Sequence, residues 1–541
     1  MIMVRIRWRH VLVIGATMTS LASGEAAEAP RPARDRPNII IILADDLAYR
    51  DLGCFGQRAF ATPHTDRMAA EGRIFTNAYA GAAWCAPSRT ALLTGLTDVN
   101  FAPLTCDAKG IGTRFRPTIA ELLRPAGYAT CAIGKWHMAE PADCSRDDQP
   151  APAQMPWHRG FDTCRIGFVH GFNCHFPHQL LTGDDTSIAV PENHKLSEDY
   201  FRDYYGIGDR FTVRHHGEGI YNAEGLFVDQ AGNDITRLRY AEDLYREAAE
   251  SFIAANRSRP FLLYYASSLV HFPIVAKRID GFADRPATWT TMHKAYAASV
   301  QEFDRTVGAI LNAIRTEELE HNTIVLVTSD NGFTAGFNFP AMGVPWGPQL
   351  AMWDDVALFA NKGPWNRGKH INTAGGLIVP FIAWGPGRVP PGATNRVITF
   401  TDVLDTAREL SGTSLLGHTD GTSFVPLLEG RDDQHPPHSP TLWSGIACHY
   451  AAMNDDWAHG AVPIARPNPD GPYRPDATLL DERWFAMGFR QPEGLAIRLF
   501  DLVNDPGQQV DIAVNHPELC QRAAKMFDLA VVTGTQPSGF P

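Results

Sequence analysis

Two apolar runs, far apart in the chain, each end in side chains that carry oxygen ligands. One reads Asn-Ile-Ile-Ile-Ile-Leu over Asn38–Leu43, and the other reads Thr-Ile-Val-Leu-Val over Thr323–Val327. Continuous β-branched runs of this kind predict strands that are buried on both faces, as in a parallel sheet. Asp45-Asp46 and Asp330-Asn331 follow the two runs. Because open α/β sheets bind ligands at the carboxyl ends of their strands, we expect these side chains to meet at one site.

Helix-like and strand-like segments alternate around these two runs. Amphipathic stretches predict helices, and short apolar runs predict strands. The alternation predicts an α/β fold with a large mixed, mostly parallel sheet that is flanked by helices on both faces. The expected helices are Pro117–Ala126, Arg239–Ala255 and Tyr296–Ile314, and the further expected strands are Tyr128–Ile133 and Pro260–Ala266.

A polar, proline-rich stretch marks a domain boundary at Arg431–Pro440. We expect residues 30–430 to form one large domain that carries the site. The remainder, residues 431–541, is rich in Trp, Pro and Gly and contains a strand pattern near Leu495–Leu502. It is expected to form a smaller C-terminal α+β domain.

The N-terminus has the three-part layout of a secretory signal. Three arginines within residues 5–9 precede an apolar run over residues 11–21 and small residues up to position 29. The run is shorter than the roughly 20 residues that a bilayer-spanning helix needs. Residues 1–29 are therefore expected to be a cleaved signal, which predicts a periplasmic or secreted protein without a stable membrane anchor.

Charge and cysteine content narrow the function. The formal net charge is −12, with 48 basic and 60 acidic residues, which argues against a general nucleic-acid partner. The nine cysteines are an odd number, so at least one is unpaired or has a special role. Their spacing resembles no zinc site, and the important thiol must be found from its context.

That context is the run Trp84-Cys85-Ala86-Pro87-Ser88-Arg89, which is followed by Thr-Ala-Leu-Leu-Thr-Gly. Pro87 suits the first turn of a helix and Gly95 suits its C-cap. Cys85 would then lie at a helix N-terminus, where free N–H groups and the helix dipole favour an anion. A lone cysteine before a helix is usually structural, but Cys-x-Pro-Ser-Arg is a specific pattern.

With this pattern the chain resembles the formylglycine-dependent sulfatases, the arylsulfatase-like members of the alkaline phosphatase superfamily. The resemblance implies a sulfuric ester hydrolase that acts on a small-molecule or carbohydrate sulfate ester. It also implies that a formylglycine-generating enzyme oxidises Cys85 to formylglycine, whose hydrated gem-diol attacks sulfur. Further blocks occur in the family's order: Pro37–Asp46, Leu52–Cys54, Thr62–Asp66, Gly134–His137, Ser329–Gly332, Val379-Pro380, Asp402–Gly430 and Phe500–Pro506.

Asp45, Asp46, Asp330 and Asn331 offer hard oxygen ligands, which suit Ca²⁺, or Mg²⁺ as the alternative, and not zinc. Either motif alone is more often a helix cap or a turn. Their joint placement at two strand ends favours a metal site, and the resemblance adds residue Cys85 to the ligand set.

The resemblance also assigns the catalytic side chains. Lys135 and His137 lie two residues apart after an expected strand, so in an extended segment they project to the same side. Lys135 is implied to bind the sulfate anion, and His137 is implied to form a hydrogen bond with the nucleophile. Arg89 and Lys369 are implied to balance charge on the sulfate, and His271 to protonate the leaving oxygen.

One segment departs from the family pattern. Relatives usually carry an acidic residue before a double glycine and an arginine just after it, whereas this chain reads Ala374-Gly375-Gly376-Leu377-Ile378. The departure leaves open how Lys369 is oriented. Lys362 is the alternative candidate for the lysine that binds the sulfate.

Three other functions are compatible with parts of the sequence. They are a phosphonate or phosphate monoester hydrolase of the same superfamily, an inactive sulfate-ester-binding protein in which Cys85 stays a thiol, and a metal-dependent esterase or lipase. The last is disfavoured because no Gly-x-Ser-x-Gly elbow lies between a strand and a helix. The loops Gly167–Leu181 and Tyr200–Tyr221 are expected to line the mouth of the site and to contact the alcohol half of the substrate.

Overall fold

The computed structural model describes the greater part of the chain. The described residues are 36–97, 111, 117–139, 152–168, 179–183, 186–190, 224, 239–271, 274–333, 359–361, 363–365, 368–369, 372–414, 418–443, 476–491 and 494–533. The expected signal at residues 1–29, the loop Tyr200–Tyr221 and most of Gly167–Leu181 lie outside them. Among the described residues, no helix is both long enough and apolar enough to cross a bilayer.

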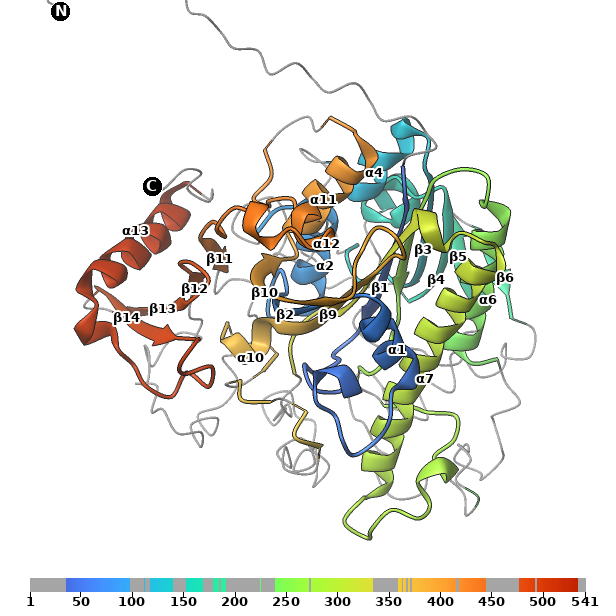
Figure 1. Ribbon diagram of the computed structural model, residues 1–541, viewed down its shortest axis with the longest axis horizontal. Helices are drawn as coiled ribbons and strands as arrows, with labels where there is room; N and C mark the ends of the chain where they lie inside the picture. The colour runs from blue at the N-terminus through green and yellow to red at the C-terminus, as the bar shows by residue number, and fades with distance from the viewer. Residues whose placement is uncertain are drawn as a thin grey trace, which may run out of the picture.

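One large mixed sheet organises the described part of the N-terminal domain (Figure 1). Its strand order is β10-β2-β9-β8-β1-β7-β3-β4-β5-β6, and the five central strands from β8 to β4 run parallel. The strands are β1 (Asn38–Ala44), β2 (Arg73–Tyr79), β3 (Ala129–Lys135), β4 (Thr163–Phe168), β5 (Gln179–Gly183), β6 (Thr186–Ala189), β7 (Phe261–Ala266), β8 (Thr323–Ser329), β9 (Ile378–Trp384) and β10 (Gly392–Thr399).

Helices cover both faces of this sheet, as the sequence predicted. Alternate residues of β1 show the two layers, because Ile40 and Ile42 join one core cluster whereas Ile39 and Ile41 join the other. The first cluster packs under α1 (Pro63–Glu71), α6 (Ala241–Ala255) and α7 (Thr291–Thr316). The second packs under α2 (Cys85–Thr94), α4 (Ile119–Leu123), α11 (Asp402–Ser411) and α12 (Val425–Leu428). The predicted helices and strands are all present, with ends that differ by a few residues.

A second sheet begins after the proline-rich stretch. It is antiparallel, in the order β11 (Thr441–Trp443), β12 (Asp476–Leu479), β13 (Trp484–Gln491) and β14 (Gly494–Asp501), and α13 (Pro517–Thr533) packs against it. Its other face shares a buried cluster with the end of the large sheet, in which Trp443 and Phe485 meet Tyr79 and Leu377. The small domain therefore packs beside the β2 and β10 edge of the large sheet (Figure 1).

Two glycines near β3 offer a matched test of the backbone that leads to the site. Gly134 has φ 94°, and a Cβ at this position would lie 2.0 Å from the carbonyl oxygen of Ala266 on β7. Gly127 has φ 89° but has nothing within 4 Å of such a Cβ. Both substitutions strain the backbone, but only the one at Gly134 also forces two strands apart.

We expect Gly127→Ala to lower the free energy of unfolding by about 1–2 kcal/mol, the cost of a left-handed residue with a side chain. Gly134→Ala should cost a further ~1–3 kcal/mol, because overpacking displaces neighbouring backbone. Urea unfolding of the two variants measures the difference. Equal losses would mean that the β3–β7 contact is not as close as described.

Candidate active site

The predicted metal ligands meet at the carboxyl ends of β1 and β8. These strands are neighbours, with Ala44 opposite Ser329, so the residues that follow them emerge side by side. The Asp330 amide donates to the Ala44 carbonyl at 3.0 Å, and the Asp46 amide donates to Asp330 Oδ1 at 3.2 Å. Asn331 Nδ2 donates to Asp46 Oδ1 at 2.8 Å. All four side chains are buried. The contacts among them confirm that distant parts of the sequence form one cluster.

Cys85 is the first residue of α2, and it is 1% exposed. Trp84 precedes it in an extended conformation, and Gly95 ends the helix with φ 67°, as predicted for a C-cap. The Cys85 sulfur and one carboxylate oxygen each from Asp45, Asp46 and Asp330 all lie within 4.8 Å of one another. The helix start therefore places residue 85 directly against the three carboxylates.

Three buried cations pair with these three carboxylates. Arg89 donates from Nε and Nη2 to Asp330 Oδ2 at 2.9 and 2.7 Å. Lys135 Nζ lies 2.6 Å from Asp45 Oδ2, and Lys369 Nζ lies 2.6 Å from Asp46 Oδ1. Lys369 thus points into the cluster despite the departure at Ala374, whereas the alternative candidate Lys362 lies outside the described residues.

Burial and these ion pairs set the protonation of the cluster. Burial by itself would raise the pKa of the Asp45 carboxyl, but the surrounding cations, Lys135 foremost, hold it well below its usual range. Burial raises the pKa of Asp330 to about 6, although the Arg89 guanidinium opposes the shift. Burial also raises the pKa of the Cys85 thiol to about 12. An unmodified Cys85 would therefore be protonated at neutral pH and a poor nucleophile.

Two oxygens of the cluster lack a hydrogen-bond partner among the described residues. Asp45 Oδ1 and Asn331 Oδ1 are buried and accept no hydrogen bond, although Arg89 Nη2 lies 3.4 Å from Asp45 Oδ1. A buried acceptor without a partner costs about 1–3 kcal/mol, which a bound cation would recover. The donors are carboxylate and amide oxygens, the set that Ca²⁺ and Mg²⁺ prefer. The residues present therefore fit a hard divalent cation.

The two predicted histidines lie at the edge of the cluster. His271 Nε2 is 3.7 Å from Asp46 Oδ2, and burial lowers the pKa of His271 to about 4, with Lys135 adding to the shift. His137 packs edge-on against Trp84 with ring centroids 6.3 Å apart. Its φ of 54° is left-handed, so the prediction of an extended segment through Lys135 and His137 was wrong. His137 therefore faces the start of α2 because of the turn after β3, and not because side chains alternate along a strand.

Two buried acids that support the site were missed from the sequence. Asp51 Oδ2 accepts hydrogen bonds from the Ala48 amide at 2.7 Å and from the Tyr296 hydroxyl at 2.5 Å, which fixes the turn after Asp46. Glu242, on α6, accepts from Ser267 Oγ at 2.7 Å and from the Tyr265 hydroxyl at 2.8 Å, which fixes the loop that leads to His271. The sequence does hold a signal for Asp51, which lies five residues after Asp46. It holds none for Glu242, because an acid in the first turn of a helix is common.

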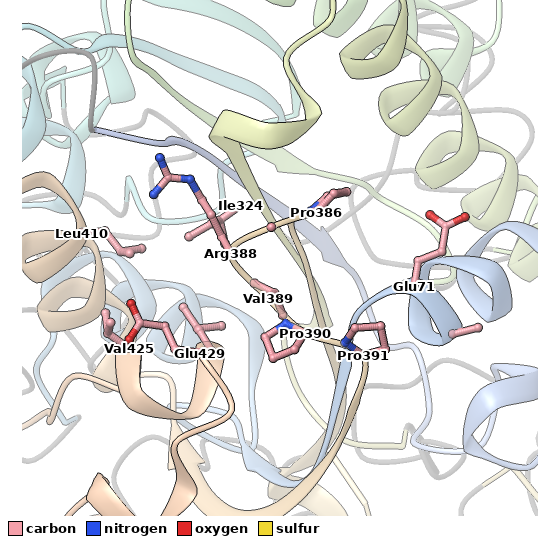
Figure 2. Close-up of a pocket in the computed structure, with 13 residues that line it drawn as sticks. Glu71, Ile324, Pro386, Arg388, Val389, Pro390, Pro391, Leu410, Val425 and Glu429 are labelled. Carbon is pink, nitrogen blue, oxygen red and sulfur yellow. The ribbon is translucent and has the colours of Figure 1, made fainter.

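A separate groove of about 870 Å³ lies at the other end of the large sheet (Figure 2). It is lined by the end of α1, the β9–β10 loop, α11 and α12, and its charged residues are Glu71, Arg388 and Glu429. Ile324, near the start of β8, lines it, whereas Asp330 follows the end of the same strand. None of the clustered residues lines this groove, so the reactive groups are separated from it by the length of β8.

Comparisons with known proteins agree on the chemistry. A family model described as Sulfatase matches residues 37–413. N-acetylgalactosamine-6-sulfatase of Canis lupus familiaris is 30% identical over 441 residues, which cover 78% of this chain and 70% of that protein. Arylsulfatase A of Homo sapiens is 29% identical over 427 residues, which cover 76% and 70%.

Solved structures share the architecture. The crystal structure of Ps i-CgsB superposes with a TM-score of 0.64 at 25% identity, covering 93% of this chain and 95% of that one. A structure described as a complex with its substrate D-glucosamine-2-N,6-O-disulfate has a TM-score of 0.57 at 16% identity, covering 92% and 97%. The second likeness concerns the fold alone.

The oxygen cluster predicts how divalent cations will bind. Asp45→Asn and Asp330→Asn should each weaken binding of Ca²⁺ or Mg²⁺ by at least about 10-fold, because each removes one of few charged ligands. Asp402→Asn is the matched control, since Asp402 is equally buried but accepts its hydrogen bonds from Thr399 and Thr422 on another part of the domain. Calorimetric titration of chelator-treated protein measures the affinities. Unchanged affinity in both site variants would make the carboxylates purely structural.

Proposed function

The chain belongs to the sulfatase family and is a sulfuric ester hydrolase, and we propose that it cleaves sulfate monoesters with formylglycine made from Cys85 and a bound calcium ion. The observation that carries the proposal is the place of Cys85, within Cys-x-Pro-Ser-Arg and directly against three carboxylates. As a thiol with a pKa of about 12, it would serve poorly as a nucleophile there. Oxidation to an aldehyde that hydrates would supply hydroxyl groups in the same place.

Asp45, Asp46, Asp330, Asn331 and an oxygen of modified residue 85 would hold the calcium ion. When bound, calcium supplies positive charge that stabilises a deprotonated hydroxyl and the sulfate oxygens. Magnesium is the alternative ion, because the ligand types suit both.

The chain's own residues then account for the remaining steps. One hydroxyl of residue 85, in its deprotonated form, forms a bond to sulfur while the bond from sulfur to the ester oxygen breaks. His271, whose lowered pKa makes its protonated form a strong acid, gives the departing alcohol its proton. The second hydroxyl next gives its proton to His137, whose buried Nδ1 has no other hydrogen-bond partner among the described residues, the aldehyde re-forms, and sulfate leaves as the carbon–oxygen bond breaks. A sulfate ester of ordinary serine could not leave in this manner, which is why the modification is needed.

The buried cations hold the sulfate group in this scheme. Arg89, Lys135 and Lys369 carry three positive charges that balance Asp45, Asp46 and Asp330. A divalent ion adds two positive charges, which a deprotonated hydroxyl and a singly charged sulfate ester would neutralise. A phosphate monoester brings nearly two negative charges near neutral pH and would leave one of them uncompensated. The charge balance therefore favours sulfate over the phosphate or phosphonate alternative.

The substrate is proposed to be a sulfated carbohydrate. The relative from Canis lupus familiaris is named for a 6-sulfate of N-acetylgalactosamine, and a structural neighbour holds a glucosamine disulfate. We further propose that residues 1–29 direct the protein to the periplasm or outside the cell and that a formylglycine-generating enzyme matures it. Both rest on the sequence patterns described above.

The oxidation of Cys85 changes the mass of its peptide and can be detected directly. Active protein should contain a Cys85 peptide that is lighter than the cysteine form by roughly 18 Da, from loss of sulfur and two hydrogens and gain of one oxygen. Cys85→Ala should be inactive, whereas Cys520→Ser, at a half-buried cysteine of the C-terminal domain, should keep wild-type turnover. Peptide mass spectrometry and an aryl sulfate assay give both results. Full activity with an intact Cys85 thiol would exclude the formylglycine mechanism.

Selectivity separates the sulfatase from the phosphohydrolase. We expect kcat/KM for an aryl sulfate to exceed that for the matching aryl phosphate by at least about 100-fold, or ~2.7 kcal/mol of transition-state discrimination, because the site balances one substrate charge. Paired assays with the same leaving group measure the ratio. Equal or faster turnover of the phosphate or phosphonate ester would favour the alternative.

A further inference from the structure

The short helix α10 (Ala374–Leu377) receives its cap from the other domain. Thr373, at its N-cap, makes no capping hydrogen bond with its side chain. The first amide of the helix, that of Ala374, instead donates to Oε1 of Gln508 at 2.8 Å. Gln508 follows β14 in the C-terminal domain, is fully buried and has a left-handed φ of 52°. A strained, buried residue thus satisfies an amide that the helix leaves free.

The capped segment, residues 372–377, and Lys369 border the loop that carries two predicted metal ligands. At one end the Lys369 amide donates to the Phe333 carbonyl at 2.6 Å, and at the other the Gly332 amide donates to the Gly376 carbonyl at 2.9 Å. The backbones are so close that a Cβ on Gly332 would lie 2.1 Å from the Gly375 carbonyl oxygen. A shift of α10 would therefore move Lys369, and the loop beside it, relative to Asp46.

We propose that Gln508 is a positioning residue for the sulfate-binding lysine. From the C-terminal domain, its side-chain oxygen holds α10 in the place where Lys369 Nζ lies 2.6 Å from Asp46. The inference rests on the proposed function in one respect, which is that Lys369 contacts the sulfate group.

If Gln508 only held the two domains together, its loss should affect sulfate binding no more than the loss of another contact between the domains. Arg396, on β10, pairs with Glu482 of the small domain at 2.8 Å, and neither residue belongs to α10. Glu482→Gln weakens this contact between the domains without touching the capped segment. It is therefore the matched control for any variant of Gln508.

The test uses the full-length, matured protein, an aryl sulfate as substrate and inorganic sulfate as a competing ligand. Gln508→Met keeps the volume but removes the acceptor, and should raise both KM and the Ki of sulfate by at least about 10-fold while kcat falls less. Gln508→Glu keeps an acceptor oxygen and should restore both values to within about 3-fold of wild type. Glu482→Gln should leave both unchanged.

A second variant approaches the same hydrogen bond from the donor. Ala374→Pro removes the amide at the first helical position, where proline is tolerated, and should raise the Ki of sulfate as Gln508→Met does. Unchanged Ki in Gln508→Met and Ala374→Pro, or equal increases in Glu482→Gln, would overturn the inference. Loss of turnover in Cys85→Ala tests the proposed function separately, because it does not depend on how sulfate affinity varies among these variants.

Discussion

The burial of six charged side chains at one end of the large sheet constrains the rest of the structure. Asp45, Asp46 and Asp330 face Arg89, Lys135 and Lys369, and each of the six is at most 5% exposed. A buried ion costs several kcal/mol unless it is paired and hydrogen-bonded, so removing one partner exposes that cost. The pairs at 2.6 to 2.9 Å therefore hold the ends of β1, β3 and β8 and the helix α2 in fixed relation.

The fold makes this arrangement possible from residues that are distant in the chain. The parallel strands β1, β7, β3 and β8 all have their carboxyl ends on the same side of the sheet. The loops that follow β1, β7 and β8 form backbone hydrogen bonds with one another there. The Asp45 carbonyl accepts from the Val270 amide at 2.6 Å, and the Ala44 carbonyl accepts from the Asp330 amide at 3.0 Å. Helices on both faces exclude water from the strands. The small C-terminal domain adds a contact through Gln508 to Ala374, the first residue of α10.

Much of this could be predicted because the signals are local. The apolar runs of β1 and β8 identify buried parallel strands, and their polar ends identify the cluster. The turn at His137 could not be predicted from strand alternation, because its left-handed backbone depends on what packs around it. Glu242 and Gln508 were missed for a related reason. Each acts through hydrogen bonds to partners distant in sequence, Ser267 and Ala374, so neither leaves a pattern among its neighbours.

We propose that the buried cluster and residue 85 together form one cation-dependent nucleophilic site. A crystal structure of catalytically active protein, with anomalous scattering to identify the metal, would show whether they do. We expect one calcium ion with oxygens of Asp45, Asp46, Asp330 and Asn331 at about 2.3–2.6 Å. We also expect an oxygen in place of sulfur at residue 85. An active protein with sulfur at residue 85, or with its metal bound away from these four side chains, would exclude such a site.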